Sequence, residues 1–318
     1  MKQEKIKFKQ EIPIVFATDD NYAPFLGVAL RSILETGSKD NYHRIYILNT
    51  NISEKNIKRL LEFECENLSI EFVDVTKKLD SVGTQLPLRD YYTNTIYYRI
   101  FIPSLFPEHD KMLYLDCDVI LLEDVANLFN TKIEGKLMGV IPEDVMANFD
   151  IFGVYSEEVL NISRYKYFNS GVLVMNTKEM REYEIEKRFV NMLKKFKFEV
   201  APDQDYLNVL CTHNISYIDL GWNKSPIPFD YFEEENLKLA HYKINWKPWH
   251  YENVRYEKYF WENAKKTSFY EEIKEMLANY GDKEKQKDLK TFDNLVALAT
   301  RYIKDPNNYK KTILRKEI

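Results

Sequence analysis

Two aspartates placed two residues apart are the first feature of this sequence that could do chemistry. Asp116 and Asp118 lie in "MLYLDCDVILL", a run that is otherwise apolar. In an extended segment residues i and i+2 point the same way, so both carboxylates can reach one spot. Two carboxylates that close repel each other unless a proton or a cation lies between them. The pair therefore predicts a Mg²⁺ or Mn²⁺ site, the alternative being a strand end with one capping and one solvated aspartate.

A hydrophobic strand followed by DxD is typical of two kinds of enzyme. In haloacid-dehalogenase-type phosphatases the first aspartate is a nucleophile, and Thr or Val follows the second after one more residue. This chain has Ile120 there, and it has no GDxxxD motif downstream. In nucleotide-sugar glycosyltransferases the same pair holds a metal ion on the diphosphate of the donor.

The segments around the pair indicate what must position it. Strand–helix–strand alternation predicts a parallel α/β sheet with ligands at the carboxyl ends of the strands. The expected strands are residues 12–18, 44–50 and 68–75, and the expected helices are residues 24–37 and 53–64, with Ser53 as a cap.

Further along, the periodicity predicts a short helix in "TNTIYYRIFIPSLFP" that ends before Pro103 or Pro107. We also expect a strand within residues 167–177, one charged helix over residues 178–196 and a helix that starts near Asp203. Beyond Tyr251 the chain reads as helical and highly charged.

Composition narrows the class of protein. The chain has 318 residues, of which 45% are hydrophobic, so it can bury a sizeable core. A net charge of −5 argues against a broad nucleic-acid-binding surface, and we expect no nucleic-acid partner. The three cysteines have no paired spacing, which is typical of a reducing compartment. The N-terminus lacks the apolar run of a signal peptide, so we expect a cytoplasmic, soluble protein.

Five ordered blocks carry a family resemblance: "IVFATDDNY", "LYLDCDVIL", "YFNSGVLVMN", "DQDYLN" and "HYKINWKPW". Together they resemble glycosyltransferase family 8, which includes bacterial lipopolysaccharide galactosyl- and glucosyltransferases and glycogenin. The resemblance runs from about Ile12 to His250. It implies a GT-A type nucleotide-diphospho-sugar transferase fold, a Rossmann-like mixed sheet flanked by helices. We expect the catalytic domain over residues 1–250 and a helical, charged C-terminal segment over residues 251–318.

The resemblance also implies roles for the metal and the nucleotide. Asp116, Asp118 and His241 would bind the metal ion, and the imidazole favours Mn²⁺ over Mg²⁺. Asp19 and Asn21 would hydrogen-bond the uracil edge. The same part of the pocket would be completed by the stacking ring of Tyr22, the backbone of Ala17 or Thr18, and the segment at Cys117, which lies against the ribose. From the sequence alone, "DDNY" reads as a helix-capping turn.

A second set of residues would hold the diphosphate and the sugar. Lys247 would neutralise the departing diphosphate. At Ile244 the family often has glycine, which donates its backbone N–H to phosphate, so we expect the loop here to avoid glycine-only angles. The remaining implied contacts of the donor sugar are Arg99, Asn169, Ser170 and Asp203, with Gln204 below the anomeric carbon.

These roles imply a retaining hexosyltransferase. It would move galactose or glucose from UDP-galactose or UDP-glucose to a saccharide or lipid-linked saccharide acceptor. An amide is a poor nucleophile, so Gln204 favours a front-face route, in which its carbonyl oxygen stabilises the oxocarbenium-like centre. Asp203 is the candidate for a double displacement. The alternative functions are a metal-dependent phosphatase and a non-catalytic UDP-sugar-binding protein.

The C-terminal segment allows two interpretations. An apolar stripe at helical spacing predicts packing against the catalytic domain; it consists of Leu289, Phe292, Val296, Ala299 and Ile303. Residues 283–318 contain ten Lys or Arg against five Asp or Glu. The basic residues past the stripe could instead rest on an anionic inner membrane leaflet; they are Lys304, Lys310, Lys311, Arg315 and Lys316.

Overall fold

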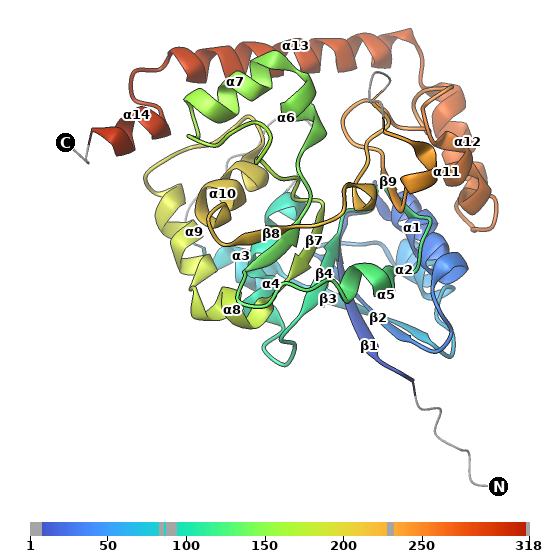
Figure 1. Cartoon of the computed structure of the whole chain (residues 1–318). Coiled ribbons are helices and arrows are strands. Elements are labelled where there is room, and N and C mark those ends of the chain that lie inside the picture. Colours follow the sequence, from blue (N-terminus) through green and yellow to red (C-terminus); the bar gives the residue numbers. More distant parts are fainter. Residues whose placement is uncertain (1–7, 83–85, 87–93, 228–231, 316–318) are drawn as a thin grey trace, which may run out of the picture.

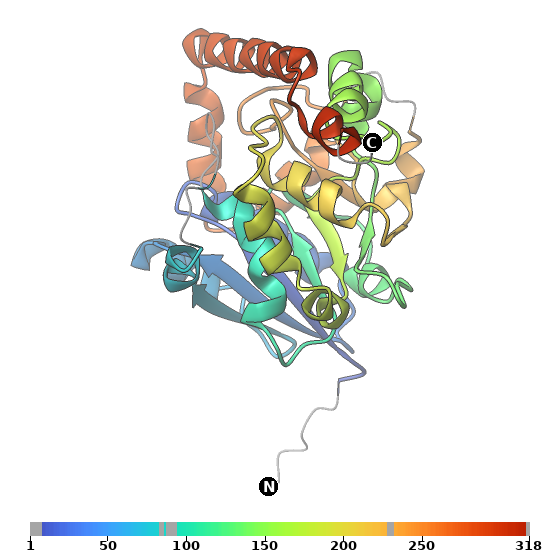
Figure 2. The same cartoon turned by 90° about the vertical axis from the view of Figure 1, so that its left-hand side faces the viewer.

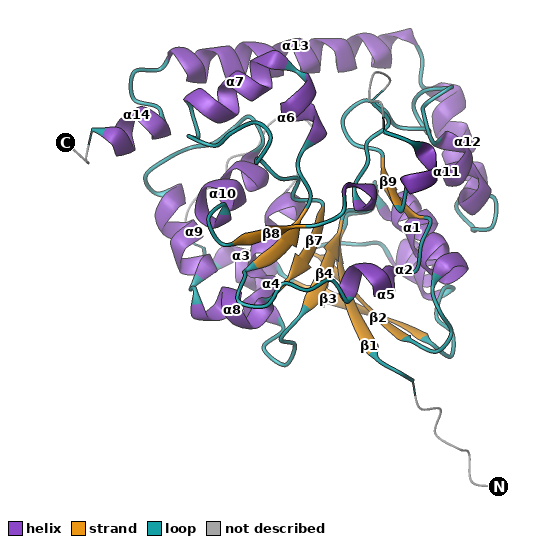
Figure 3. Ribbon diagram, viewed as in Figure 1, coloured by secondary structure: helices purple, strands orange, loops and turns teal. Residues whose placement is uncertain are grey.

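A seven-stranded sheet forms the centre of the molecule (Figures 1 and 3). The computed structural model describes residues 8–82, 86, 94–227 and 232–315. The strand order is β3-β2-β1-β4-β7-β6-β8. The strands are β1 (Glu11–Ala17), β2 (Tyr42–Asn49), β3 (Leu68–Asp74), β4 (Met112–Leu115), β6 (Met138–Val140), β7 (Val172–Met175) and β8 (Ile215–Tyr217).

The direction of β7 makes this sheet mixed. Strands β1 to β4 pair in parallel, as strand–helix alternation predicts. β7 runs antiparallel to both β4 and β6, and β8 is parallel to β6. The local pattern that predicts a parallel sheet is therefore right for the first four strands only, whereas the mixed GT-A type sheet is confirmed. Because β7 is antiparallel, its first residue, Val172, lies opposite the last residue of β4, Leu115.

A second, two-stranded sheet joins distant parts of the chain. β5 (Val119–Leu121) pairs antiparallel with β9 (Leu239–His241), and Val119 lies opposite His241. The backbone N–H of Tyr242 donates to the carbonyl of Asp118 at 2.9 Å. This pairing places His241 next to Asp118, although the two residues are more than 100 positions apart in the sequence.

Helices cover both faces of the sheet (Figure 3). At α2 the Ser53 hydroxyl accepts from the N–H of Asn56, so the predicted cap is confirmed. Up to the end of the matched blocks the helices are α1 (Ala23–Thr36), α2 (Glu54–Leu61), α3 (Thr76–Asp80), η1 (Asn94–Tyr97), α4 (Tyr98–Leu105), α5 (Val125–Phe129), α6 (Asp144–Asn148), α7 (Asp150–Glu158), α8 (Thr177–Glu182), α9 (Ile185–Leu193), α10 (Pro202–Cys211), η2 (Leu220–Trp222) and η3 (Glu234–Asn236).

Two helix predictions need correction. α4 runs through Pro103 and ends at Leu105, so of the two predicted ends only the one before Pro107 is right. The single helix expected over residues 178–196 is two helices, α8 and α9. They are separated at Glu184, whose φ of 53° lies in the left-handed region and interrupts a right-handed helix.

The C-terminal segment consists of α11 (Glu257–Ala264), α12 (Tyr270–Asn279), α13 (Asp282–Lys304) and α14 (Tyr309–Leu314). Just before α12, Phe269 packs under the Arg59 guanidinium, 3.7 Å from the ring centroid, and Arg59 pairs with Glu272. α13 crosses the top of the molecule and packs against α7 (Figure 2).

The apolar stripe of α13 faces the catalytic domain, with one exception. Ala299 is buried, and Phe292, Val296 and Ile303 pack against the core that contains Phe152 and Tyr155 of α7. Leu289 is 65% exposed, so its assignment to the stripe is wrong. The helix reaches the domain only from about Phe292 onward. The domain boundary near residue 250 stays a prediction.

The core that packs against α13 also surrounds a buried carboxyl group. Asp205 on α10 accepts hydrogen bonds from the hydroxyls of Tyr155 and Tyr167, at 2.8 and 2.6 Å. Burial raises the pKa of Asp205 to about 7, although the two tyrosines oppose that shift. The folded state therefore keeps a proton that the unfolded chain loses near the ordinary value of 3.8.

We predict that Asp205→Asn weakens the pH dependence of stability. The stabilisation of the folded state by Asp205 is fully present below pH 4. It is lost as pH rises toward 7, because the unfolded chain then releases a proton that the folded state still holds. The wild type should lose up to about 1.4 kcal/mol of unfolding free energy per pH unit relative to the variant. Urea unfolding of both proteins at pH 5, 6 and 7 measures this difference. Parallel curves would contradict the assignment.

Candidate active site

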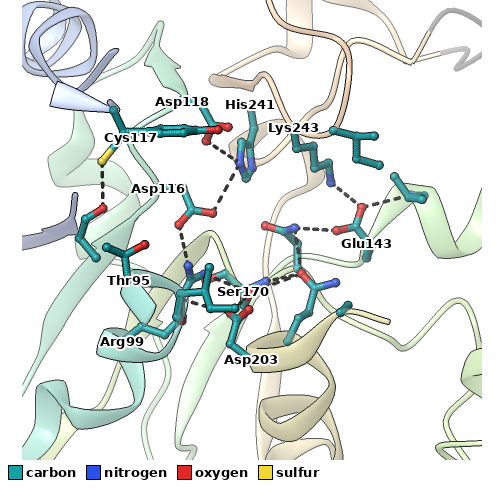
Figure 4. Close-up of a pocket in the computed structure, with 18 of the residues that line it drawn as sticks. Thr95, Arg99, Asp116, Cys117, Asp118, Glu143, Ser170, Asp203, His241 and Lys243 are labelled. Atoms are coloured by element: carbon teal, nitrogen blue, oxygen red, sulfur yellow. Dashed lines mark hydrogen bonds and ion pairs between the residues drawn. The ribbon is translucent and has the colours of Figure 1, made fainter. Parts of the chain in front are cut away.

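A pocket lies where β1 and β4 end and β7 begins, beside the end of β9 (Figure 4). This is the carboxyl edge at which parallel α/β strands bind ligands. The pocket is lined by nearly all of the predicted site residues: Ala17, Thr18, Asp19, Tyr22, Arg99, Asp116, Cys117, Asp118, Asn169, Ser170, Asp203, Gln204, His241, Ile244 and Lys247. Asn21 is exposed and is not among the lining residues.

Asp116, Asp118 and His241 converge on one point. Each offers one ligand atom, and these atoms all lie within 4.8 Å of one another. His241 Nε2 is 3.2 Å from Asp118 Oδ1 and 3.7 Å from Asp116 Oδ2. The two aspartates follow β4 directly, and the histidine is the last residue of β9. Sheet pairing thus brings the three groups together.

The imidazole is oriented from behind. His241 Nδ1 lies 2.9 Å from Asn223 Oδ1, and the Asn223 amide donates to Asn169 Oδ1 at 2.8 Å. This network places a proton on Nδ1, so in the neutral imidazole Nε2 would present its lone pair to the two carboxylates. Two carboxylates and an imidazole nitrogen that face one point need a positive charge among them, either a second proton on the ring or a metal ion. Two carboxylate oxygens and one imidazole nitrogen suit a divalent ion such as Mn²⁺. The hydrogen bond at the other ring nitrogen of His241 is also typical of a metal-binding histidine.

Each carboxylate also has a cationic partner outside the cluster. Arg99 Nη2 and the Tyr114 hydroxyl donate to Asp116 Oδ1, at 2.9 and 2.8 Å. Lys247 Nζ donates to Asp118 Oδ2 at 2.7 Å. Burial alone would raise the pKa of Asp118, but Lys247 and then His241 hold it well below its ordinary value. Lys247 and His241 thereby keep Asp118 ionised, and the two cationic partners orient both carboxylates.

The sugar-side residues form one hydrogen-bonded group. Asn169 donates to Glu143 at 2.6 Å and to Gln204 Oε1 at 3.1 Å. The N–H of Ser170 also donates to Gln204 Oε1, and the Ser170 hydroxyl donates to Asp203, both at 2.9 Å. Donors from the turn before β7 therefore surround the carbonyl oxygen of Gln204. Asp203 is buried, which raises its pKa, and its carboxylate lies 3.3 Å from Arg99 Nε.

At the end of the pocket where the nucleotide is predicted to bind, "DDNY" forms the capping turn that its sequence suggests. Asp19 Oδ1 accepts from the N–H groups of Asn21 and Tyr22, at 3.0 and 3.2 Å. Both hydrogen bonds are accepted by Oδ1, so Oδ2 of Asp19 takes no part in the capping turn. Cys117 donates its S–H to the carbonyl of Ala17 at 3.2 Å, and burial raises its pKa well above the ordinary value. Cys117 is therefore a buried thiol and not a nucleophile.

Sequence reasoning missed a buried ion pair in this pocket. Lys243 Nζ donates to Glu143, and it lies 2.9 Å from Asp144. Burial alone would lower the pKa of Lys243, but Asp144 and Glu143 raise it. Asn223 and Tyr114, which support the metal ligands, were missed as well. The signal for Glu143 is an acidic pair directly after the apolar run that forms β6.

The loop after His241 contradicts one expectation. Ile244 has a φ of 56°, in the left-handed region that a non-glycine residue here is expected to avoid. A β-branched residue there costs about 1–2 kcal/mol and persists only where neighbours hold it. The neighbours do so here, because Lys243 is tied to Glu143 and Lys247 is tied to Asp118.

An α/β protein with this sheet and this site is a glycosyltransferase of the GT-A fold. The chain belongs to glycosyltransferase family 8: the family profile "Glycosyl transferase family 8" matches residues 13–253.

Two similar proteins from bacteria and one solved structure share between a quarter and three tenths of their residues with this chain. General stress protein A of Bacillus subtilis is 28% identical over 257 residues, 74% of this chain and 86% of that protein. A lipopolysaccharide 1,2-glucosyltransferase of Escherichia coli is 26% identical over 79% of this chain and 78% of its own length. The solved structure of the galactosyltransferase LgtC with donor and acceptor sugar analogues has a TM-score of 0.65 at 26% identity and covers 81% of this chain and 96% of that one.

The bifunctional glycosyltransferase WbbM is also similar in structure. Its TM-score is 0.74 at 26% identity, over 86% of this chain and 52% of that chain. The family membership and the fold that the sequence motifs predict are confirmed. The individual site roles stay predictions, which the following substitution begins to test.

We predict that Gly171→Ala disrupts the metal site while the fold persists. An added Cβ would lie 2.2 Å from Asp116 Oδ2 and 2.5 Å from His241 Cε1, so both ligands must move. Mn²⁺ affinity, measured by titration calorimetry, should fall at least tenfold.

A matched control is Gly153→Ala, whose Cβ would meet only the Arg164 side chain, which can move away. That variant should bind Mn²⁺ as the wild type does. Unchanged Mn²⁺ binding by the Gly171 variant would contradict the assigned site.

Proposed function

We propose that this glycosyltransferase transfers a hexose, galactose or glucose, from its UDP-sugar to a saccharide or lipid-linked saccharide acceptor, with Mn²⁺ and with retention of anomeric configuration. The single observation that supports this proposal best is the convergence of Asp116, Asp118 and His241 at the carboxyl edge of the sheet. When bound there, Mn²⁺ would neutralise charge on the diphosphate as the sugar leaves.

The chain's own residues supply the remaining functions. Lys247 is buried and held toward the cluster by Asp118 and by the carbonyl of Tyr242, so it can follow the charge that develops on the leaving diphosphate. Its ammonium also lies 5.5 Å from the ring centroid of Tyr22. Tyr22 is half-buried at the pocket wall and suits stacking on the uracil ring.

The contacts of Asp203 support a front-face route. Its carboxylate already accepts from Ser170 and faces Arg99, so attack on the sugar would break a buried ion pair. In the front-face route the departing diphosphate accepts the acceptor's proton, and no protein nucleophile is needed. Gln204 orders the turn at Ser170, and its proposed place is below the anomeric carbon.

The activities named for two similar proteins support the proposal that the product is a glycan of the cell surface. One relative is a lipopolysaccharide glucosyltransferase, and one structural neighbour is a galactosyltransferase. We therefore propose a role in cell-surface glycan synthesis. Galactose and glucose differ only in the orientation of one hydroxyl group, so a donor screen decides between them.

We predict UDP release from UDP-galactose or UDP-glucose in the presence of Mn²⁺, even without an acceptor. Asp118→Asn should lower this rate at least a hundredfold, because it removes a charged ligand and leaves Lys247 without its partner. Asp150→Asn is the matched control, since the Asp150 side chain is 91% exposed. Wild-type rates in the Asp118 variant would refute the metal role, and release of phosphate from simple phosphoesters would favour a phosphatase.

Contact of the C-terminal tail with an anionic inner leaflet is a separate proposal. In the part of the chain that the structure describes, no helix has both the length and the apolar character needed to cross a bilayer. Lys310 pairs with Glu158, and Lys311 donates to the carbonyls of Ile303 and Asp305. Both lysines thus contribute to the protein's own packing. Lys316 lies outside the described residues.

Liposome co-sedimentation tests this contact. We expect the full chain to pellet with phosphatidylserine vesicles at low salt more than a chain that ends after Asp305. That truncation removes α14 and leaves α13 in place. Neutral phosphatidylcholine vesicles are the control. Equal pelleting of the two chains would remove the proposal.

A further inference from the structure

One wall of the active-site pocket is apolar and includes the C-terminal segment. α13 contributes Phe292 and Leu295 to the pocket lining, although it starts 33 positions after Trp249, the end of the last motif block. The apolar side chains on this wall are Met146, Phe152, Val200, Ile244, Phe292 and Leu295.

This wall is anchored to both of the regions that flank it. The Phe292 ring lies 5.8 Å from Phe149 and 6.0 Å from Phe152, centroid to centroid. Phe149 in turn lies 6.3 Å from Trp246, in the loop that follows His241. α13 is therefore connected through aromatic contacts to the loop that carries Lys247. The wall is a fixed part of the pocket.

Ile244 gives independent evidence that an apolar surface is needed here. Its backbone is in the left-handed region, where glycine would carry no strain. The side chain nevertheless lines the pocket and packs against the same core as Phe292 and Leu295. A strained side chain at a functional site is a reason to infer a role for that side chain.

The polar groups near this wall are paired with one another. Lys243 is tied to Glu143 and Asp144, so its charge is already balanced. Among the described lining residues, the polar side chains nearest in sequence to Ile244 and Phe292 are otherwise those of Asn245 and Thr291. A phosphate group on this wall would find no unpaired cation among the described wall residues. A saccharide would find few hydrogen-bonding partners, whereas a hydrocarbon or aromatic group would be matched.

We propose that this wall is the acceptor subsite for an apolar aglycone: the acceptor is a sugar that carries a hydrocarbon or aromatic group, and that group lies on Ile244, Phe292 and Leu295. This inference rests on the proposed function. In the transfer, an acceptor hydroxyl oxygen forms the bond to the anomeric carbon, and the bond from that carbon to the diphosphate oxygen breaks. The hydroxyl proton leaves with UDP.

Alkyl glycosides test the subsite directly. Methyl, hexyl and octyl β-glucosides and β-galactosides are offered, below their micellar concentrations, with the donor that the wild type hydrolyses. We expect kcat/KM to rise about tenfold from methyl to octyl, the gain that burial of roughly two methylene groups gives. For a glycoside that is not glycosylated, the inhibition constant against donor hydrolysis should fall by the same factor.

Three variants and one control locate the effect. Phe292→Ala, Leu295→Asn and Ile244→Gly should each reduce the gain from methyl to octyl to less than threefold. Leu289→Ala is the control, because Leu289 is on the same helix and 65% exposed, and it should leave the gain intact. Ile244→Gly relieves backbone strain, so this variant tests the subsite even if the α13 variants unfold.

The outcomes separate the two proposals. If the wild type hydrolyses neither UDP-sugar, the proposed function fails. If it hydrolyses one of them but treats methyl and octyl glycosides alike, the function stands and the apolar subsite is refuted. A lactoside that outperforms the octyl glycosides would assign the wall to a second sugar ring and would also overturn the aglycone assignment.

Discussion

The site depends on holding two ionised carboxylates and an imidazole lone pair at one point. Such an arrangement is repulsive until a cation occupies it, so the fold must stabilise it in advance. Arg99 binds the outer oxygen of Asp116, and Lys247 binds the outer oxygen of Asp118. Each carboxylate therefore keeps one oxygen for the cluster that faces His241. Without Lys247, burial would favour a protonated Asp118, which is a poor metal ligand.

Backbone geometry places the groups of this site next to one another. Because β7 is antiparallel to β4, the turn Asn169–Gly171 lies beside Asp116, whose N–H donates to the carbonyl of Gly171 at 2.8 Å. A side chain at Gly171 would occupy the space of Asp116 and His241. The same turn carries Asn169, which links Glu143 and Gln204 to Asn223 behind the histidine. The candidate metal ligands and the proposed sugar-binding residues therefore belong to one hydrogen-bonded unit.

The strained backbone of Ile244 and the helix α13 form another side of the pocket. Ile244 is held in a left-handed conformation between two buried ion pairs, those of Lys243 and Lys247. Such a conformation is stable only because both ends of the loop are fixed. α13 completes this side from outside the matched blocks, with Phe292 and Leu295. The proposed acceptor side thus combines Ile244, where the family often has glycine, with a helix from outside the matched residues 13–253.

The sequence by itself determined the elements and most of the site residues. Apolar runs and caps such as Ser53 are local signals, and the spacing of Asp116 and Asp118 is a local signal for two carboxylates at one point. The structure places both aspartates in the turn between β4 and β5, however, and not in the extended segment that the spacing predicts. Three features depended on the tertiary structure: the antiparallel direction of β7, the positive φ of Ile244 and the insertion of α13 into the pocket. Each is decided by contacts between residues far apart in the chain, such as Lys243 with Glu143, and local periodicity carries no information about such contacts.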